Sequence, residues 1–193
     1  MALFVGEQWI FVHVPKTAGT SITRTLLTNP GVSRIPGRKH MPCRTLRENY
    51  PGVRCFGFVR NPWDRIVSLF SFIKDGGVKS YDFGDRQLAL KRGFKAWLLE
   101  GSFVAPERAG WGGRPVQRQP QLFWLKGCSF VGRYERLQKD FDQACRLIGV
   151  PSARLPRNNT SVHPPYQELY DDETREAVAK WFAADIERWG YRF

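Results

Sequence analysis

A lysine, a glycine and three hydroxyl side chains stand close together just after an apolar stretch that begins at Trp9. The run is Val12-His13-Val14-Pro15-Lys16-Thr17-Ala18-Gly19-Thr20-Ser21-Ile22. An apolar strand, a short loop and a helix start in this order predict an anion site, because N–H groups at a helix N-terminus and the helix dipole both favour negative charge. Lys16 adds a positive charge, and the hydroxyls add donors. The expected ligand is a phosphate or a close relative of phosphate.

This loop differs from the P-loop of nucleoside triphosphatases. In that motif, G-x-x-x-x-G-K-[ST], the lysine follows the last glycine, whereas Lys16 precedes Gly19 by three residues. A nucleoside triphosphatase is therefore disfavoured. The alternative interpretation of the segment is a buried strand followed by an ordinary capped helix.

A second strand, turn and helix are predicted about forty residues later, over 55–70. Residues 55–59 form an apolar run that suits a buried parallel strand. Asn61 can cap the next helix, and Pro62 suits its first turn. Arg60 ends the strand, at the sheet edge where open α/β folds bind ligands, and Ser68 lies two turns into the helix. Guanidinium binds phosphate oxygens bidentately and serine adds a neutral donor; a surface ion pair and a helix-face serine are the alternatives.

Together the two segments resemble the sulfotransferases that use 3′-phosphoadenosine 5′-phosphosulfate (PAPS). The order Pro-Lys-Thr-Ala-Gly-Thr-Ser over 15–21 is similar to their 5′-phosphosulfate loop, in the carbohydrate branch that includes heparan sulfate 2-O-sulfotransferase. The family pattern V-R-N/D-P-x-x-R-x-x-S is matched at Arg60, Pro62, Arg65 and Ser68. The resemblance implies that Arg60 and Ser68 bind the 3′-phosphate. It also implies a 5′-phosphosulfate site made by Lys16, Thr17, Ala18, Gly19, Thr20 and Ser21.

Weaker similarity to the family continues along the chain. It lies in Arg118–Gln121, in Phe130–Glu135 and in the ending Trp189–Phe193. In members of the family, a loop late in the chain closes over the nucleotide. Arg157–Ser161 is the candidate for that loop in this sequence, and the resemblance implies Asn159 and Thr160 as cofactor contacts. A plain turn before the final helix explains that loop equally well.

The coarse element pattern alternates strands and helices. Strands are predicted at 8–14, 53–59 and 129–133, and helices at 19–29, 43–49, 62–74, 135–147 and 171–188, with further helical stretches near 85–99 and 118–126. This alternation predicts an α/β fold with a parallel sheet. The resemblance further implies a three-layer, P-loop-like sulfotransferase fold, in which helices flank a central parallel sheet. We expect this fold to form one domain over 1–193.

Sulfuryl transfer resembles phosphoryl transfer, so catalysis is mostly positioning and electrostatic stabilisation. Lys16 would stabilise the leaving oxygen, and no metal is implied. A histidine suits the general base, because its ordinary pKa lies near neutrality. Of the three histidines, His13 falls in the first strand and His163 in a late loop. The family's proposed base stands between the two phosphate segments, so we predict His40 as the base.

The formal net charge of +12 and a pI near 10 indicate an anionic partner. An acidic acceptor, a nucleic acid and simple solubilising surface charge all remain open. The four cysteines show no zinc spacing. No stretch of eighteen apolar residues is present, so we expect a cytoplasmic protein without a membrane anchor, more like a bacterial member of the family. The Gly- and Arg-rich segment 101–119, with Trp111, is a candidate acceptor lid or an ordinary long loop.

Three functions from different classes follow. The leading prediction is a PAPS-dependent sulfotransferase acting on a hydroxyl, and the resemblance favours a carbohydrate acceptor. A nucleotide or small-molecule kinase is disfavoured by the position of Lys16 and by the missing magnesium carboxylates. A basic nucleic-acid-binding module is permitted by the charge, but no nucleic-acid motif is present, so no dedicated nucleic-acid partner is expected.

Overall fold

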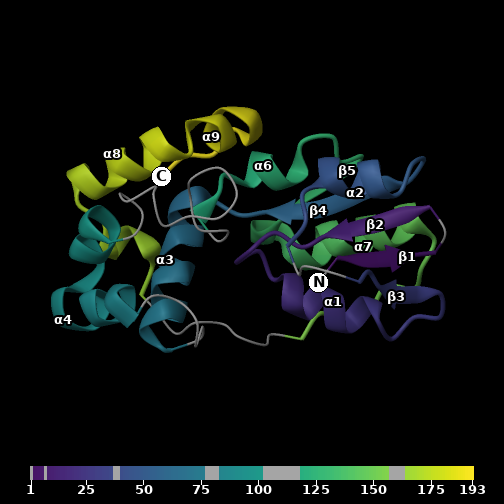
Figure 1. Cartoon of the computed structure of the whole chain (residues 1–193), viewed down its shortest axis with the longest axis horizontal. Coiled ribbons are helices and arrows are strands. Elements are labelled where there is room, and N and C mark those ends of the chain that lie inside the picture. Colours follow the sequence, from purple (N-terminus) through teal and green to yellow (C-terminus); the bar gives the residue numbers. More distant parts are fainter. Residues whose placement is uncertain (1, 7, 37–39, 77–82, 102–117, 157–163) are drawn as a thin grey trace. The chain divides into compact units, whose positions relative to one another are not determined.

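The computed structural model describes residues 2–6, 8–36, 40–76, 83–101, 118–156 and 164–193 (Figure 1). They fall into two compact units. The first unit consists of Met1–Arg60 and Gln121–Asn159, and the second of Asn61–Pro120 and Thr160–Phe193. Among the described residues, no helix combines the length and the apolar character needed to cross a bilayer.

The first unit contains a five-stranded sheet. Its strands lie in the order β3 (Val32–Arg34), β1 (Leu3–Val5), β2 (Trp9–Val12), β4 (Arg54–Val59) and β5 (Phe130–Arg133). The three long strands β2, β4 and β5 are parallel, with Ile10 opposite Cys55 and Gly57 opposite Val131. The short strand β1 is antiparallel to both its neighbours. The parallel strands are apolar along nearly their whole length, because helices cover both faces.

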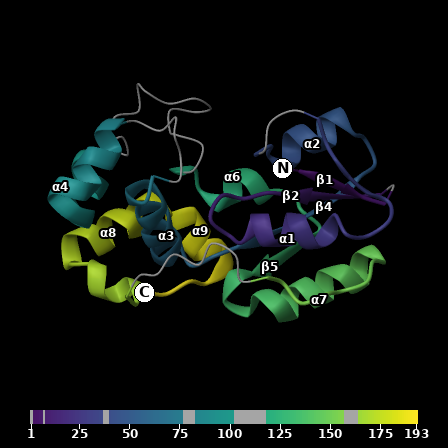
Figure 2. The same cartoon turned by 90° about the horizontal axis from the view of Figure 1, so that it is seen from below.

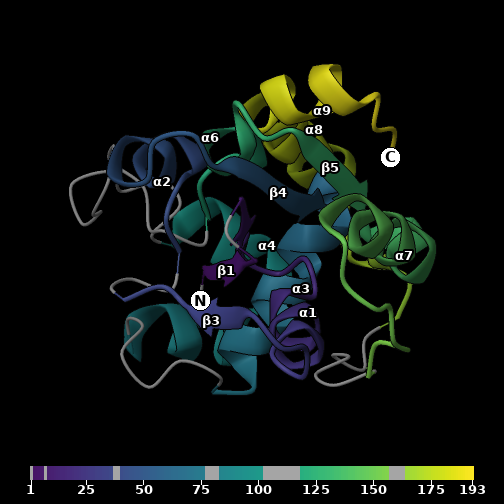
Figure 3. The ribbon, with the colours of Figure 1, turned by 90° about the vertical axis from the view of Figure 1, so that its right-hand side faces the viewer.

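Helices α1 (Gly19–Leu26) and α7 (Leu137–Ile148) cover one face of this sheet, and α2 (Cys43–Asn49) and α6 (Gln121–Leu125) cover the other (Figure 2). Figure 3 shows α7 and α2 on opposite sides of β4 and β5. The core against α1 and α7 combines Phe11, Phe56 and Phe58 of the strands with Ile22 and Phe141 of the helices. The predicted α/β fold, with a central sheet between helices, is confirmed.

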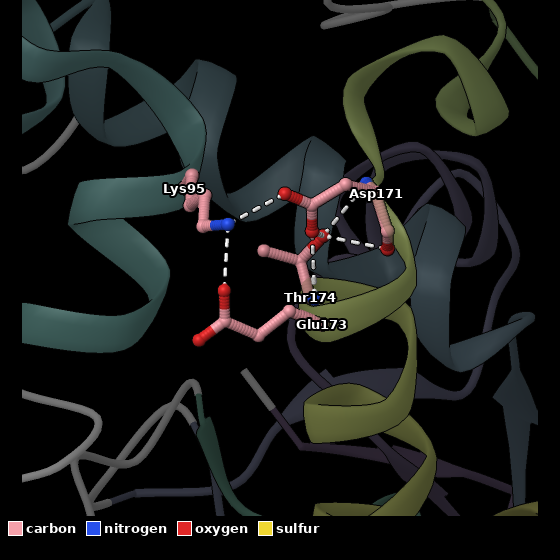
Figure 4. Close-up of polar contacts among 4 residues, drawn as sticks. All are labelled: Lys95, Asp171, Glu173 and Thr174. Atoms are coloured by element: carbon pink, nitrogen blue, oxygen red, sulfur yellow. Dashed lines mark hydrogen bonds and ion pairs between the residues drawn. The ribbon is translucent and has the colours of Figure 1, made fainter.

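The second unit is helical. It contains α3 (Pro62–Lys74), α4 (Phe83–Glu100), the 3₁₀ helix η4 (Tyr166–Leu169), α8 (Asp172–Trp181) and α9 (Ala183–Trp189). The Asn61 side chain caps α3 by accepting a hydrogen bond from Trp63 N–H, and α4 bends at Gly93. Lys95 on α4 contacts Asp171, the N-cap of α8, and Glu173 in its first turn, at 2.7 Å and 2.6 Å (Figure 4).

Several element predictions need correction. The C-terminal helix predicted over 171–188 is two helices that meet at Phe182, and β3 lies between the predicted helices 19–29 and 43–49, where no strand was predicted. The sheet is mixed, because β1 and β3 add antiparallel pairs to the predicted parallel strands. Both are three residues long, which is too short for an alternating pattern to show.

Candidate functional site

The loop between β2 and α1 has an uncommon backbone. Lys16 (φ 66°) and Ala18 (φ 61°) both adopt the left-handed region that non-glycine residues rarely occupy. Left-handed residues within a turn can aim neighbouring N–H groups toward one point, which is how a backbone forms an anion-binding concavity. Thr17 lies between them, and its buried hydroxyl donates to the Val14 carbonyl at 3.1 Å. That hydrogen bond ties the loop to the residue two positions after β2.

Helix α1 begins at this loop without a side-chain cap. Its N-cap Ala18 makes no side-chain capping hydrogen bond, and its first turn contains no acidic residue. By contrast, Asp171 and Thr174 form a reciprocal capping box at α8. Since the first N–H groups of a helix have no intrahelical partner, an uncapped N-terminus suits a bound anion. Thr20 is half-buried and Ser21 is buried in this turn.

Gly19 brings α1 against His13. A Cβ atom at Gly19 would overlap the His13 ring, which is itself buried with 4% of its surface exposed. The glycine is therefore required by close packing. The structure places His13 directly after β2, which ends at Val12, and against the start of α1.

His40 lies beside the same loop. Its Nδ1 is 2.7 Å from the His13 carbonyl oxygen, and its ring centroid is 4.9 Å from that of His13 and 6.1 Å from that of Trp124. A carbonyl oxygen only accepts hydrogen bonds, so Nδ1 carries the proton. In the neutral imidazole Nε2 is then the proton acceptor. The structure thus sets the tautomer that a general base needs.

Arg60 is held from three directions at the end of β4. Gln121 brackets its peptide: the Arg60 N–H donates to Gln121 Oε1 and Gln121 Nε2 donates to the Arg60 carbonyl, both at 2.8 Å. The guanidinium carbon lies 4.0 Å from the centroid of the Tyr134 ring, and Nη1 donates to the Lys16 carbonyl at 3.4 Å. The structure therefore brings together the Lys16 loop and Arg60, which the sequence predicted as two separate phosphate contacts.

The other predicted site residues are not all in the first unit. Ser68 lies on α3 in the second unit and is buried. Arg65, from the same sequence pattern, is fully buried; it donates to the Gln119 carbonyl at 2.9 Å and stacks on Phe182, so its role is structural. The predictions for Asn159, Thr160, His163 and Trp111 lie outside the described residues.

Two residues of the site escaped prediction from the sequence. Tyr134 supplies the ring under the Arg60 guanidinium, and Gln121 holds the Arg60 peptide from 61 positions away. The segment containing Gln121 drew notice only through its resemblance to the family, because no spacing rule reveals a contact between a side chain and a distant peptide. Within the described ranges, no group of three or more His, Cys, Asp or Glu side chains is placed to hold a metal ion.

Residues 6–98 match the model of the Sulfotransferase family. The matched range is just under half of the chain and includes the Lys16 loop, His40, Arg60 and Ser68. An uncharacterized protein of Archaeoglobus fulgidus is 23% identical over 126 residues, which cover 65% of this chain and 92% of that protein. A sulfotransferase from Alicyclobacillus acidocaldarius, known from its crystal structure, has a TM-score of 0.44 and 15% identity, over 95% of this chain and 93% of that one.

Proposed function

We propose that this chain is a sulfotransferase that uses PAPS as its donor and a hydroxyl group, most favourably of a carbohydrate, as its acceptor. The observation that carries the proposal is the uncapped start of α1, preceded by left-handed Lys16 and Ala18 and joined to Arg60 through the Lys16 carbonyl. The match of residues 6–98 to the Sulfotransferase family supports it. The carbohydrate acceptor comes from the sequence resemblance alone.

The donor set of the first unit fits a nucleotide that carries separate phosphate groups. The loop and the first turn of α1 offer the Lys16 ammonium, backbone N–H groups and the hydroxyls of Thr20 and Ser21. Arg60 offers a planar guanidinium held on an aromatic ring, a geometry that suits bidentate contacts to phosphate oxygens. We assign the first group to the 5′-phosphosulfate and Arg60 to the 3′-phosphate. For Ser68, Asn159 and Thr160 the proposal rests on the sequence pattern.

The reaction places distinct demands on the residues around the loop. Bound PAPS supplies a sulfuryl group attached to a phosphate that leaves as an anion. Lys16 and the N–H groups of the loop stabilise negative charge at the leaving oxygen. His40 Nε2 accepts the proton of the acceptor hydroxyl, while Nδ1–H stays on the His13 carbonyl and keeps the ring in that tautomer. No residue in this scheme requires a metal ion.

Calorimetric titration separates this proposal from its alternatives. We expect adenosine 3′,5′-bisphosphate to bind without magnesium, and Lys16→Ala to weaken that binding by about tenfold or more. Lys126→Ala, an exposed lysine of the same unit, is the matched control and should bind like the unaltered chain. Preference for ATP with magnesium would indicate a kinase instead, and binding only to single or duplex strands would indicate a nucleic-acid module.

Transfer itself is then measured with labelled PAPS and a panel of hydroxylated acceptors. Sugars, lipid-linked saccharides, small metabolites and peptides belong in the panel. Label transferred to a saccharide hydroxyl, and lost in the Lys16→Ala variant, is the expected result. Transfer to peptides or metabolites alone would leave the sulfotransferase proposal standing and remove the carbohydrate acceptor.

A further inference from the structure

Three of the four cysteines meet in the first unit, although their sequence spacing gives no sign of it. Cys43 is the first residue of α2, Cys55 lies in β4, and Cys128 lies in the turn between α6 and β5. The thiol of Cys43 is within hydrogen-bonding reach of both Cys128 and Cys55, and all three are free thiols. Cys43 and Cys55 are buried, and Cys128 is half-buried. A thiol cluster therefore lies beneath the turn that follows α6.

The surroundings favour a thiolate at Cys43. Hydrogen bonds from Cys128 and then Cys55 lower the pKa of Cys43 to about 4, with help from the Arg47 guanidinium and against the effect of burial. A Cβ atom at Gly127 would lie 3.5 Å from Arg47 Nη1 and 3.8 Å from Cys43 Sγ, so both groups border the turn that carries Cys128. Cys145 on α7 is different, because burial raises its pKa to about 11.

We propose that Cys43 and Cys128 form a peroxide-sensitive thiol pair. The Cys43 thiolate attacks one oxygen of hydrogen peroxide, displaces hydroxide and becomes a sulfenic acid. The Cys128 thiol then attacks the Cys43 sulfur, which forms the S–S bond and breaks the S–O bond, and the departing oxygen takes the Cys128 proton and leaves as water. The hydroxide from the first step takes up the proton that Cys43 released to solvent when it ionised. The two cysteines lose two electrons in all, and the peroxide is reduced to water.

Cys128 suits the second step better than Cys55. Cys55 is fixed within β4, between β2 and β5, and its carbonyl accepts a hydrogen bond from Ser129 N–H at 2.7 Å. Cys128 is the more exposed thiol and lies in a turn, where its backbone can adjust to the narrow geometry of a disulfide. Cys128 is therefore the residue that closes the bond.

The disulfide would act on the segment that carries His40. Cys43 follows His40 by three residues, and Cys128 follows Trp124, whose ring lies 6.1 Å from that of His40, by four. A covalent bond between the two cysteines would join the start of α2 to the turn after α6. The position of His40 would therefore depend on the redox state, whatever reaction the site performs.

Mass spectrometry after differential alkylation tests the pair. Mild treatment of the folded chain with hydrogen peroxide should give a Cys43–Cys128 linked peptide, with Cys55 and Cys145 still alkylated as thiols. In Cys128→Ser, Cys43 should stop at a sulfenic acid that dimedone traps. Cys145→Ser is the matched control and should form the disulfide normally. Without peroxide, Cys43 should react with iodoacetamide about tenfold or more faster than Cys145.

Three results would overturn the pair. They are oxidation of Cys145 as fast as Cys43 in the folded chain, a Cys43–Cys55 link in place of the expected one, and no link at a peroxide dose that oxidises Cys43. Cys43→Ser and Cys43→Ala should both abolish the linked peptide, so a folding defect in one of them does not decide the test.

The effect on His40 has its own measurement. The chain contains only three histidines, so their ring signals can be followed and assigned by nuclear magnetic resonance. The His40 signal should shift on oxidation of the unaltered chain and stay in place in Cys128→Ser. An unchanged His40 signal in a chain shown to carry the disulfide would refute the coupling, and neither outcome depends on sulfotransferase activity.

Discussion

Arg60 shows how strongly single contacts define the candidate site. The bracket from Gln121 fixes its peptide, Tyr134 fixes the plane of its guanidinium, and the Lys16 carbonyl accepts one of its N–H groups. A long side chain loses considerable rotamer freedom when it binds a ligand, and these contacts remove much of that freedom in advance. A flexible cation in the same place would lack this advantage.

Arg60→Lys should therefore weaken binding of adenosine 3′,5′-bisphosphate by about tenfold or more, although the charge is kept. Lysine can neither stack as a plane on Tyr134 nor offer two parallel donors. The matched control is Arg54→Lys. Arg54 stacks on Trp9 at 4.3 Å, but at the opposite end of β4. Calorimetry on both variants checks the prediction; equal affinities for the two would remove Arg60 from the phosphate site.

His40→Ala should lower turnover by about 10²-fold or more, the usual scale for loss of a general base. Affinity for adenosine 3′,5′-bisphosphate should change little, because the proposed role of His40 concerns the acceptor proton. Initial rates with labelled PAPS and parallel calorimetry separate the two effects. Turnover near that of the unaltered chain would exclude His40 from the mechanism.

At the scale of elements, the packing of α1 on His13 can be tested with a substitution whose usual effect on stability should be reversed here. Gly→Ala in a helix usually stabilises a protein, yet a Cβ at Gly19 would overlap the buried His13 ring. Gly19→Ala should therefore lower the free energy of unfolding by about 1–3 kcal/mol. In a His13→Ala background the same change should be neutral or stabilising. Urea denaturation of the unaltered chain, the two single variants and the double variant checks this. An equal loss of unfolding free energy on Gly19→Ala in both backgrounds would contradict the close contact.

The predictability of the elements follows from local signals. The bounds of α3 were predicted correctly because Asn61 and Pro62 mark its start, and those of α2 were also correct. Strands β1 and β3 were missed, since three residues give no period. In the candidate site, Lys16 and Arg60 were recognisable from their places at strand ends. The contacts of Gln121 and Tyr134 were not, because they join residues far apart in the chain.

The start of α8 gives a prediction about pH. Asp171 accepts hydrogen bonds from Lys95 Nζ at 2.7 Å and from Thr174 N–H at 2.9 Å, and these hold the pKa of Asp171 well below its ordinary range. A carboxylate whose pKa is lower in the folded chain stabilises the fold above its unfolded pKa, about 3.9, and loses that effect as the pH falls through the folded value. Lys95 and Asp171 are about half exposed, so solvent screens much of the pairing.

Asp171→Asn keeps an N-cap side chain but removes the carboxylate charge at the helix start and beside Lys95, so it should lower Tm at neutral pH by roughly 2–4 °C. The difference from the unaltered chain should shrink as the pH falls below about 4. Thermal melts across this range measure it, with Asp172→Asn, an 86% exposed neighbour, as the matched control. A difference that stays constant down to strongly acidic pH would show that the carboxylate charge contributes nothing there.

At the scale of the whole chain, the family match and the compact units divide the sequence differently. The match ends at residue 98, whereas the first unit needs β5 and α7, and the second needs α8 and α9. Tyr134 and Gln121, which hold Arg60, also lie beyond the match. The segment that resembles the family therefore depends on the rest of the chain for its core and for the geometry of its candidate site. The single domain predicted over 1–193 stays a prediction.

The charge of the whole chain bears on the acceptor. Thirty Lys and Arg residues against eighteen Asp and Glu give a net charge of +12. One molecule of PAPS, with roughly four negative charges, balances only part of this excess. An acidic acceptor, such as a saccharide bearing uronate or sulfate groups, would be attracted by the positive charge that PAPS leaves unbalanced. Attraction of this kind acts over about one Debye length, near 10 Å at 0.1 M salt, and weakens as salt is added.

For an acidic saccharide, KM should therefore rise severalfold between about 50 mM and about 300 mM salt, because the Debye length shortens across that range. A neutral saccharide of the same length, assayed at saturating PAPS, is the control and should keep its KM. Saturation matters, since PAPS is itself an anion and its own binding weakens with salt. An unchanged KM for the acidic saccharide would assign the excess charge to solubility alone and would leave the proposed sulfuryl transfer untouched.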